Sequence, residues 1–159
     1  MNCHDFQSQW PRFGRMPLPR AMWESQDYEA WSEHRAECGL CTDWSLAAEV
    51  RDRGEDPERY ACVHMAVHVT STCEHHADRH DCPEALVLYN PRFDEYGIPI
   101  RDGGSSVAVI RFCPWCGIQL PESRRNEWFA RIEALAIDPW SDDVPDEYQC
   151  DQWYRGKAT

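Results

Sequence analysis

Lysine is nearly absent from this chain of 159 residues, in which Lys157 is the single example. Lysine and arginine together number 16, against 28 aspartate and glutamate residues, so the formal net charge is −12. Proteins that bind nucleic acid gain affinity when basic side chains displace counterions from the phosphates. We therefore expect no direct binding to nucleic acid, and we expect a protein partner to carry basic charge.

Long apolar segments are missing as well. No run approaches the roughly 18 residues that a membrane-spanning helix requires, and the start of the chain, Met1–Asp5, lacks the basic and apolar regions of a secretory signal. We expect a cytoplasmic protein of a bacterial cell or of a phage-infected host, with no membrane contact. In a reducing compartment, the nine cysteines indicate metal ligands rather than a disulfide framework.

The first part of the chain is predicted to be an appendage. Three prolines make residues 1–22 irregular. From residue 23 to about residue 53 apolar side chains recur at helical spacing, and Gly39 should divide this stretch into two helices. The run Gly54-Glu55-Asp56-Pro57 is typical of a linker. The predicted domains are a helical appendage, residues 1–57, and a main domain, residues 58–159.

Strand patterns dominate the first half of the main domain. Ala61–Val69 alternates valine and methionine with other residues, which predicts a half-buried strand. One of the later strands should lie at a sheet edge, because Pro99 cannot donate a hydrogen bond to a neighbour. The three later strands are expected at Leu86–Tyr89, Ile98–Ile100 and Val107–Phe112.

A helix should follow near the C-terminus, where Trp128, Ile132 and Leu135 recur at i, i+4 and i+7. The acidic and aromatic tail is expected to pack Tyr148 and Trp153 on the sheet. The predicted fold class is α+β. It combines a zinc-ribbon-like small antiparallel β domain and its C-terminal helix with the helical N-terminal appendage.

The knuckle Cys113-Pro114-Trp115-Cys116-Gly117 follows the last expected strand. Two cysteines separated by two residues, with proline and glycine at the turn, direct both thiolates at one centre, which is half of a tetrahedral zinc–sulfur site. One Zn²⁺ is therefore expected, with two further ligands from the main domain. The candidates are Cys62, Cys73, His76 and Cys82, with His64, His75 and His80 in reserve.

A second constellation, His34-x3-Cys38-x2-Cys41, lies in the appendage. On one continuous helix these positions would share a face and could reach a second Zn²⁺. Cys3 or His4 would complete its tetrahedron. The pattern is similar to the zinc-binding motif of anti-sigma factors and of many small phage proteins.

Two catalytic interpretations compete with structural zinc. The pair Cys113 and Cys116 resembles the dithiol of thioredoxin-like enzymes, but that chemistry needs a helix after the first cysteine and a βαβ pattern, and neither is indicated. The loop His75–Asp81 mixes histidine with aspartate, as hydrolytic metal sites do. Such a run is more often a solvated loop with one structural ligand, and we assign no catalytic residue. The acid pairs Asp94-Glu95 and Asp142-Asp143 are interpreted as surface charge.

The order of motifs in the main domain points to a family. These motifs are Cys62-x2-Met65, Cys73-x2-His76-x5-Cys82-Pro83, Phe93-Asp94-Glu95-Tyr96-Gly97, Asp102-Gly103-Gly104-Ser105-Ser106, the knuckle with Leu120-Pro121-x-Ser123, and Trp128-Phe129. Over about residues 61–154 the chain resembles an uncharacterised family of small bacterial and phage proteins, a domain of unknown function with a CPWCG knuckle. The resemblance implies a zinc-binding, β-rich domain with a C-terminal helix, and no activity.

The chain departs from that family pattern at two places. Family members often have His-Cys-Cys at the start and His-Asp-Gly-Gly in the later turn. This chain has Tyr60-Ala61-Cys62 and Arg101-Asp102-Gly103-Gly104. The departures argue against a ligand directly before Cys62 and against a catalytic histidine at position 101.

The sequence favours a protein–protein interaction module over an enzyme. Thiolate-rich, four-coordinate zinc sites are closed and structural. The acidic tail, Asp138–Asp151, offers Trp140 and Tyr148 as anchors for an arginine-lined partner. We expect an accessory or counter-defence factor of a phage or mobile element. The alternative is a metal-dependent hydrolase or nuclease that uses the His75–Asp81 loop.

Overall fold

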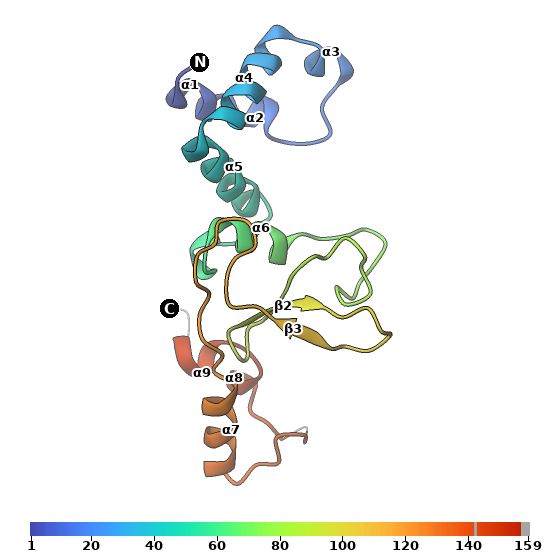
Figure 1. Cartoon of the computed structure of the whole chain (residues 1–159), viewed down its shortest axis with the longest axis vertical. Coiled ribbons are helices and arrows are strands. Elements are labelled where there is room, and N and C mark those ends of the chain that lie inside the picture. Colours follow the sequence, from blue (N-terminus) through green and yellow to red (C-terminus); the bar gives the residue numbers. More distant parts are fainter. Residues whose placement is uncertain (142, 157–159) are drawn as a thin grey trace. The chain divides into compact units, whose positions relative to one another are not determined.

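The computed structural model describes residues 1–141 and 143–156, and it divides the chain into two compact units, residues 1–70 and 71–159 (Figure 1). The predicted α+β class is confirmed: the first unit is helical, and the second contains a small antiparallel sheet and a C-terminal helix. In the described ranges no helix is long and apolar enough to cross a membrane.

The N-terminal unit is built from helices connected by short loops. Pro11 and Pro19 lie at the starts of helices, where the missing N–H has no helical partner to lose, and Pro17 lies in the loop between them. The segment predicted to be irregular is therefore largely helical. Asn2 and Ser25 cap two of the helices by accepting hydrogen bonds from the backbone N–H groups of Asp5 and Tyr28. The helices are α1 (Cys3–Ser8), α2 (Trp10–Phe13), α3 (Arg20–Trp23), α4 (Gln26–Glu37), α5 (Gly39–Asp52), the 3₁₀ turn η1 (Pro57–Arg59) and α6 (Val63–Thr70).

Aromatic side chains form the core of this unit. Phe6 of α1 stacks on Trp31 of α4 with the ring centroids 4.9 Å apart, and the Trp31 indole donates to the Phe6 carbonyl. Trp10 contacts the edge of Trp44, and its indole N–H donates to Asp52. Because α1 and α2 are too short to be stable alone, these buried rings hold them in place.

The strand predicted at Ala61–Val69 is wrong, because this segment is helix α6. Its buried residues are Met65 and Ala66, which are adjacent in sequence. A strand would have directed those two side chains to opposite faces, whereas one helical stripe can bury both. The alternation of valines over eight residues is too short to distinguish the two periods.

The C-terminal unit contains one three-stranded antiparallel sheet in the order β1-β2-β3, with β1 (Leu88–Asn90), β2 (Glu95–Pro99) and β3 (Val107–Val109). The edge position predicted for Pro99 is wrong, since β2 is the central strand. Pro99 is its last residue, so its missing N–H falls where the ladder ends. Gly97 lets β3 approach closely, because a Cβ there would lie 3.0 Å from the Val107 Cβ.

Helix α7 (Arg125–Ala134) follows the knuckle and confirms the predicted C-terminal helix, with Trp128 and Ile132 buried. Leu135 caps the helix and is exposed. The tail forms α8 (Asp146–Gln149) and α9 (Gln152–Arg155). Tyr148 and Trp153 pack with Trp128 and Ile132 of α7, not on the sheet as predicted.

Candidate metal centres

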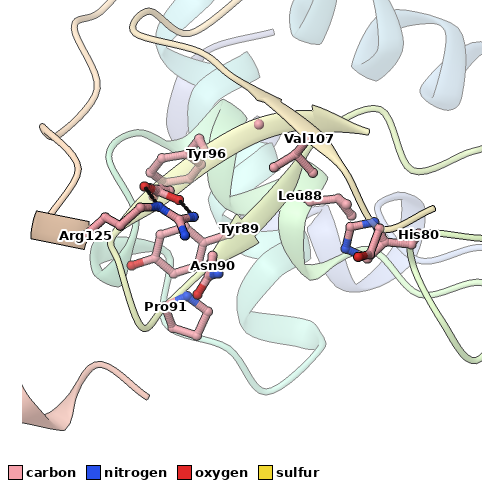
Figure 2. Close-up of a pocket in the computed structure, with 11 residues that line it drawn as sticks. His80, Leu88, Tyr89, Asn90, Pro91, Tyr96, Val107 and Arg125 are labelled. Atoms are coloured by element: carbon pink, nitrogen blue, oxygen red, sulfur yellow. Dashed lines mark hydrogen bonds and ion pairs between the residues drawn. The ribbon is translucent and has the colours of Figure 1, made fainter. Parts of the chain in front are cut away.

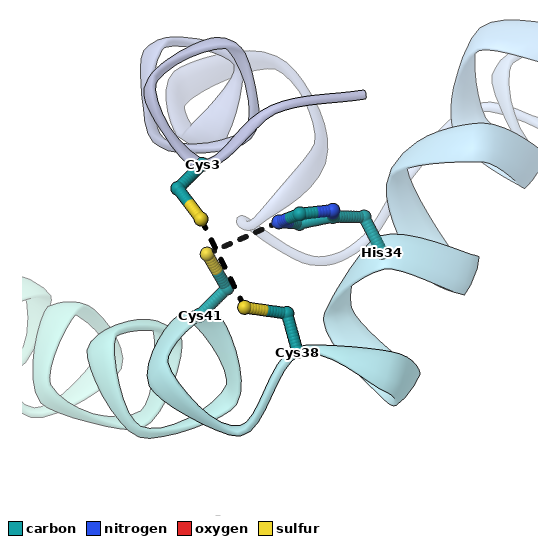
Figure 3. A group of neighbouring side chains, drawn as sticks. All are labelled: Cys3, His34, Cys38 and Cys41. Carbon is teal, nitrogen blue, oxygen red and sulfur yellow. Dashed lines mark hydrogen bonds between the residues drawn. The ribbon is translucent and has the colours of Figure 1, made fainter.

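Four candidate ligands meet in the N-terminal unit, and we name Cys3, His34, Cys38 and Cys41 the helical site (Figure 3). Cys3 begins α1, His34 lies in the last turn of α4, and Cys41 lies in the first turn of α5. Cys38 occupies the break between α4 and α5, where its extended backbone ends one helix and begins the next. The single helix face predicted for this motif is therefore wrong, and a helix break brings the ligands together instead.

The spacing of the donor atoms fits tetrahedral zinc. With typical Zn–S and Zn–N bond lengths, the edges of such a tetrahedron measure about 3.8 Å between sulfurs and about 3.6 Å between sulfur and nitrogen. The Cys3 and Cys38 sulfurs lie 3.9 Å apart, and the His34 Nε2 lies 3.2 Å from the Cys41 sulfur. All four donors lie within 4.8 Å of one another. Small adjustments of the side chains would place one ion among them.

The thiols of the helical site differ in their pKa values. Burial, followed by the neighbouring sulfurs of Cys3 and Cys38, raises the pKa of Cys41 to about 12. Cys38 has the opposite tendency, since the backbone N–H of Cys41 lowers its pKa. A bound Zn²⁺ reverses the situation at Cys41, because the ion stabilises the thiolate that burial disfavours.

Three further ligands meet in the C-terminal unit, and we name Cys73, His76 and Cys82 the loop site. The Cys73 sulfur lies 3.3 Å from the His76 Nδ1, close to the edge of a zinc tetrahedron. Hydrogen bonding to His76 is the main reason why the pKa of Cys73 is lowered. Cys82 is 4% exposed and packs with Ala85 and Leu88, so the site rests on a small apolar cluster beside the sheet.

Two arginines hold the loop that carries this site. The loop lacks regular secondary structure, so its carbonyl groups need other donors. Arg79 donates to the carbonyls of Ser71 and Val87, which lie before and after the ligands. Arg101 donates to the carbonyls of His80, Cys82 and Ala85. Arg101 thus fixes the backbone of a candidate ligand, Cys82.

The knuckle forms the expected tight turn. An isolated bridge between Phe112 and Gln119 closes it, and the Cys113 N–H donates to the Ile118 carbonyl at 2.9 Å. Gly117 adopts φ 71°, a conformation that favours glycine. Cys113 is buried and Cys116 is exposed.

The structure separates ligands that the sequence placed in one ribbon site. Within the described part of residues 71–159, Cys73, His76 and Cys82 group with one another and not with Cys113 and Cys116. Cys62 directly precedes α6 in the N-terminal unit, and its assignment to the knuckle remains a prediction. His4 and His75 are exposed and belong to none of the groups, nor does Cys150.

A pocket of about 270 Å³ opens beside the sheet (Figure 2). Glu95 is 6% exposed in its wall and accepts two hydrogen bonds from Arg125 and one from Ser123. Asp94 is also buried and accepts from Tyr89. The interpretation of this acid pair as surface charge is therefore wrong, and nothing in the sequence marked it as buried. Asp142 of the other pair lies outside the described residues. Because the Glu95 carboxylate is ion-paired with Arg125, it is not a free general base in this pocket.

Comparison with known proteins places most of the chain in one family. No curated protein and no solved structure matches it. A family model described as a domain of unknown function, DUF6980, matches residues 59–156. The match includes the loop site, the sheet, the knuckle and α7, whereas the helical site precedes it. The chain therefore belongs to the DUF6980 family.

Proposed function

We propose that this protein is a protein–protein interaction module whose folded units are stabilised by structural zinc. The observation that carries the proposal is the helical site, where three cysteines and a histidine from three helices and the break between two of them converge at tetrahedral spacing. Four protein donors close the coordination sphere, which is the arrangement of structural rather than catalytic zinc. Binding of this kind contributes directly to folding.

The separation of the candidate ligands raises the proposed number of zinc ions to three. The helical site and the loop site each take one. The knuckle supplies two thiolates for a third zinc ion. From the sequence, the remaining candidate ligand for that ion is Cys62, with His64 in reserve. The one or two ions expected from the sequence assumed that Cys73 and Cys82 belong to the knuckle.

Native mass spectrometry of the full chain tests this proposal. Three zinc ions are expected in the native protein, and Cys41→Ser, Cys82→Ser and Cys116→Ser should each lose one. Cys150→Ser is the matched control, because Cys150 belongs to none of the groups and should retain all three. A chain without zinc, or variants that all keep the native number, would refute structural zinc.

The proposed contact with a partner is the acidic tail, where Trp140 is 84% exposed. Asp138, Asp143, Asp146 and Glu147 are exposed in the same segment. An exposed tryptophan among carboxylates suits an arginine-rich surface. Together with the charge of −12, this supports a basic partner, and we propose an accessory or counter-defence role in a phage or mobile element.

Affinity capture from the native host tests the contact. Trp140→Ala should lose the captured protein, whereas Trp23→Ala should keep it, because Trp23 is exposed in the other unit. Equal capture by both variants would move the interface away from the tail.

A metal-dependent hydrolase or nuclease is the second candidate, favoured by the three donors of the loop site. This candidate predicts hydrolysis of a phosphate ester or of an amide. Cys82→Ser should abolish that activity, and Cys150→Ser should retain it. Zinc binding without turnover supports the interaction module.

A further inference from the structure

The loop site has three donors where the helical site has four. In the described ranges, no other histidine, cysteine or carboxylate lies within 4.8 Å of all three donors of the loop site. His80 is the reserve ligand nearest to Cys82 in sequence. It lines the pocket with Leu88 and Val107 instead, as the close-up shows (Figure 2). A zinc ion held by two cysteines and one histidine completes its coordination with water or another external ligand.

The surroundings of the loop site leave it accessible from one side. Cys82 is buried against Ala85 and Leu88, so one side of the site is apolar. Cys73 and His76 are half-buried, and the residues between His76 and Arg79 are exposed. The helical site differs in its number of donors rather than in exposure, because Cys3 is exposed there but supplies a fourth ligand atom.

Charge selects the class of external ligand. Zn²⁺ with two thiolates and a neutral histidine has no net charge. Its loop carries three acidic residues, against the two positive charges of Arg79 and Arg101, so the local balance stays negative by one charge. The two guanidinium groups donate to backbone carbonyls and are not directed at a ligand of the metal. In a chain with a net charge of −12, an anion would be repelled. A neutral nitrogen donor avoids this repulsion and matches the preference of zinc for nitrogen and sulfur.

We propose that zinc in the Cys73–His76–Cys82 site keeps one exchangeable coordination position, which takes water and is accessible to small neutral heteroaromatic nitrogen ligands. The inference rests on the proposed zinc binding of the loop site. It goes beyond the closed, structural role proposed for the helical site. The reaction is a ligand substitution at the metal: water leaves, the nitrogen lone pair forms the new bond, and no electron or proton is transferred.

Cobalt substitution in the full chain tests this position. Cobalt(II) replaces zinc in such sites, and its visible absorption reports the ligands and their geometry. The probe is imidazole. We expect a saturable shift of the cobalt spectrum in the native chain and in Cys41→Ser, where the loop site is intact. The shift should be lost in Cys82→Ser and in His76→Ala, two variants that remove different ligands of the site.

The outcomes separate this inference from the proposed function. If Cys82→Ser and His76→Ala bind as much cobalt as the native chain, the loop site binds no metal, and both proposals fail there. If they bind one ion fewer but imidazole leaves the native spectrum unchanged, the site is closed, and only the exchangeable position is refuted. The site is also closed if the cobalt spectrum of His80→Ala differs from that of the native protein before imidazole is added, because His80 would then be a fourth ligand.

Azide tests the charge argument. At equal concentration it should shift the spectrum less than imidazole does. A tighter response to azide than to imidazole would overturn the assignment of a neutral ligand class.

Discussion

Glu95 shows how a single carboxylate stabilises the C-terminal unit. Burial by itself raises its pKa, but the hydrogen bonds from Arg125 and Ser123 and the charge of Arg125 outweigh burial, so the pKa of Glu95 is lowered. The lowered pKa means that the folded state favours the carboxylate form. The resulting stabilisation is complete above the pKa of the unfolded chain, about 4.3, and is lost as the pH falls through the lower pKa of the folded protein.

Glu95→Gln is therefore expected to reduce the free energy of unfolding by about 1–3 kcal/mol at neutral pH, as for a lost hydrogen bond to a charged group. The difference from the native protein should be constant above about pH 5 and shrink below it. Urea denaturation across pH measures it. Glu127→Gln is the control, because Glu127 forms exposed ion pairs with Arg124 and Arg131. Equal loss in both variants would contradict a special role for Glu95.

Arg101 offers a second prediction at this scale. Its guanidinium fixes the carbonyls on both sides of the Cys82 ligand, and residues that orient metal ligands typically contribute 10–100-fold to metal affinity. Arg101→Met should weaken zinc binding at the loop site by about 10-fold or more. Competition with a chelator, followed by native mass spectrometry, measures the affinity for the loop-site ion. This ion is identified as the one that Cys82→Ser loses. Arg131→Met is the control, because it removes an exposed ion pair with Glu127, and it should not change the affinity for zinc.

At the scale of elements, predictions succeeded where the pattern was long or the motif specific. The period of Trp128 and Ile132 predicted α7, and the spacing of Cys113 and Cys116 predicted the tight turn that the backbone forms. The prediction for α6 failed because eight valine-rich residues fit both periods, and its contact with α5 decides the outcome. Tertiary packing overrides a short local pattern.

Helix α1 should depend on metal. It has six residues, too few for a stable isolated helix, and two side chains connect it to the unit: Phe6 in the core and Cys3 in the helical site. Removing zinc with a chelator should increase hydrogen exchange in residues 3–8 several-fold. Cys3→Ser should reproduce the effect without chelator, and Cys150→Ser should not. Unchanged exchange in α1 after complete zinc removal would show that Phe6 alone holds the helix.

At the scale of the whole molecule, the sequence singled out cysteines and histidines that cluster in the fold, but not how they group. The spacing of His34, Cys38 and Cys41 predicted one cluster, and the structure adds Cys3 as the sequence proposed. Cys73 and Cys82 were assigned to the knuckle because a ribbon needs four ligands. Only the folded loop, held by Arg79 and Arg101, shows that His76 lies with them in a separate group. Spacing along a chain does not specify which distant segments meet.

The charge of the chain predicts its behaviour toward nucleic acid. With a formal charge of −12, it should show no measurable affinity for duplex DNA at about 0.15 M salt, because it has too few basic side chains to release counterions. Fluorescence anisotropy of a labelled duplex measures this. Micromolar or tighter binding in the same buffer would contradict the charge argument.

The exposure of Trp140 also makes the tail optically visible. Trp31 and Trp128 are almost fully buried, whereas Trp140 is 84% exposed and lies among carboxylates. A positively charged collisional quencher such as caesium should reach its excited indole more often than the negatively charged iodide does. Trp23 and Trp115 are exposed too, so a basic partner that covers the tail should remove only the part of this difference that Trp140 contributes. Intrinsic emission can therefore follow docking without a dye. The variant Trp140→Phe measures the quenching of the other tryptophans, which is subtracted.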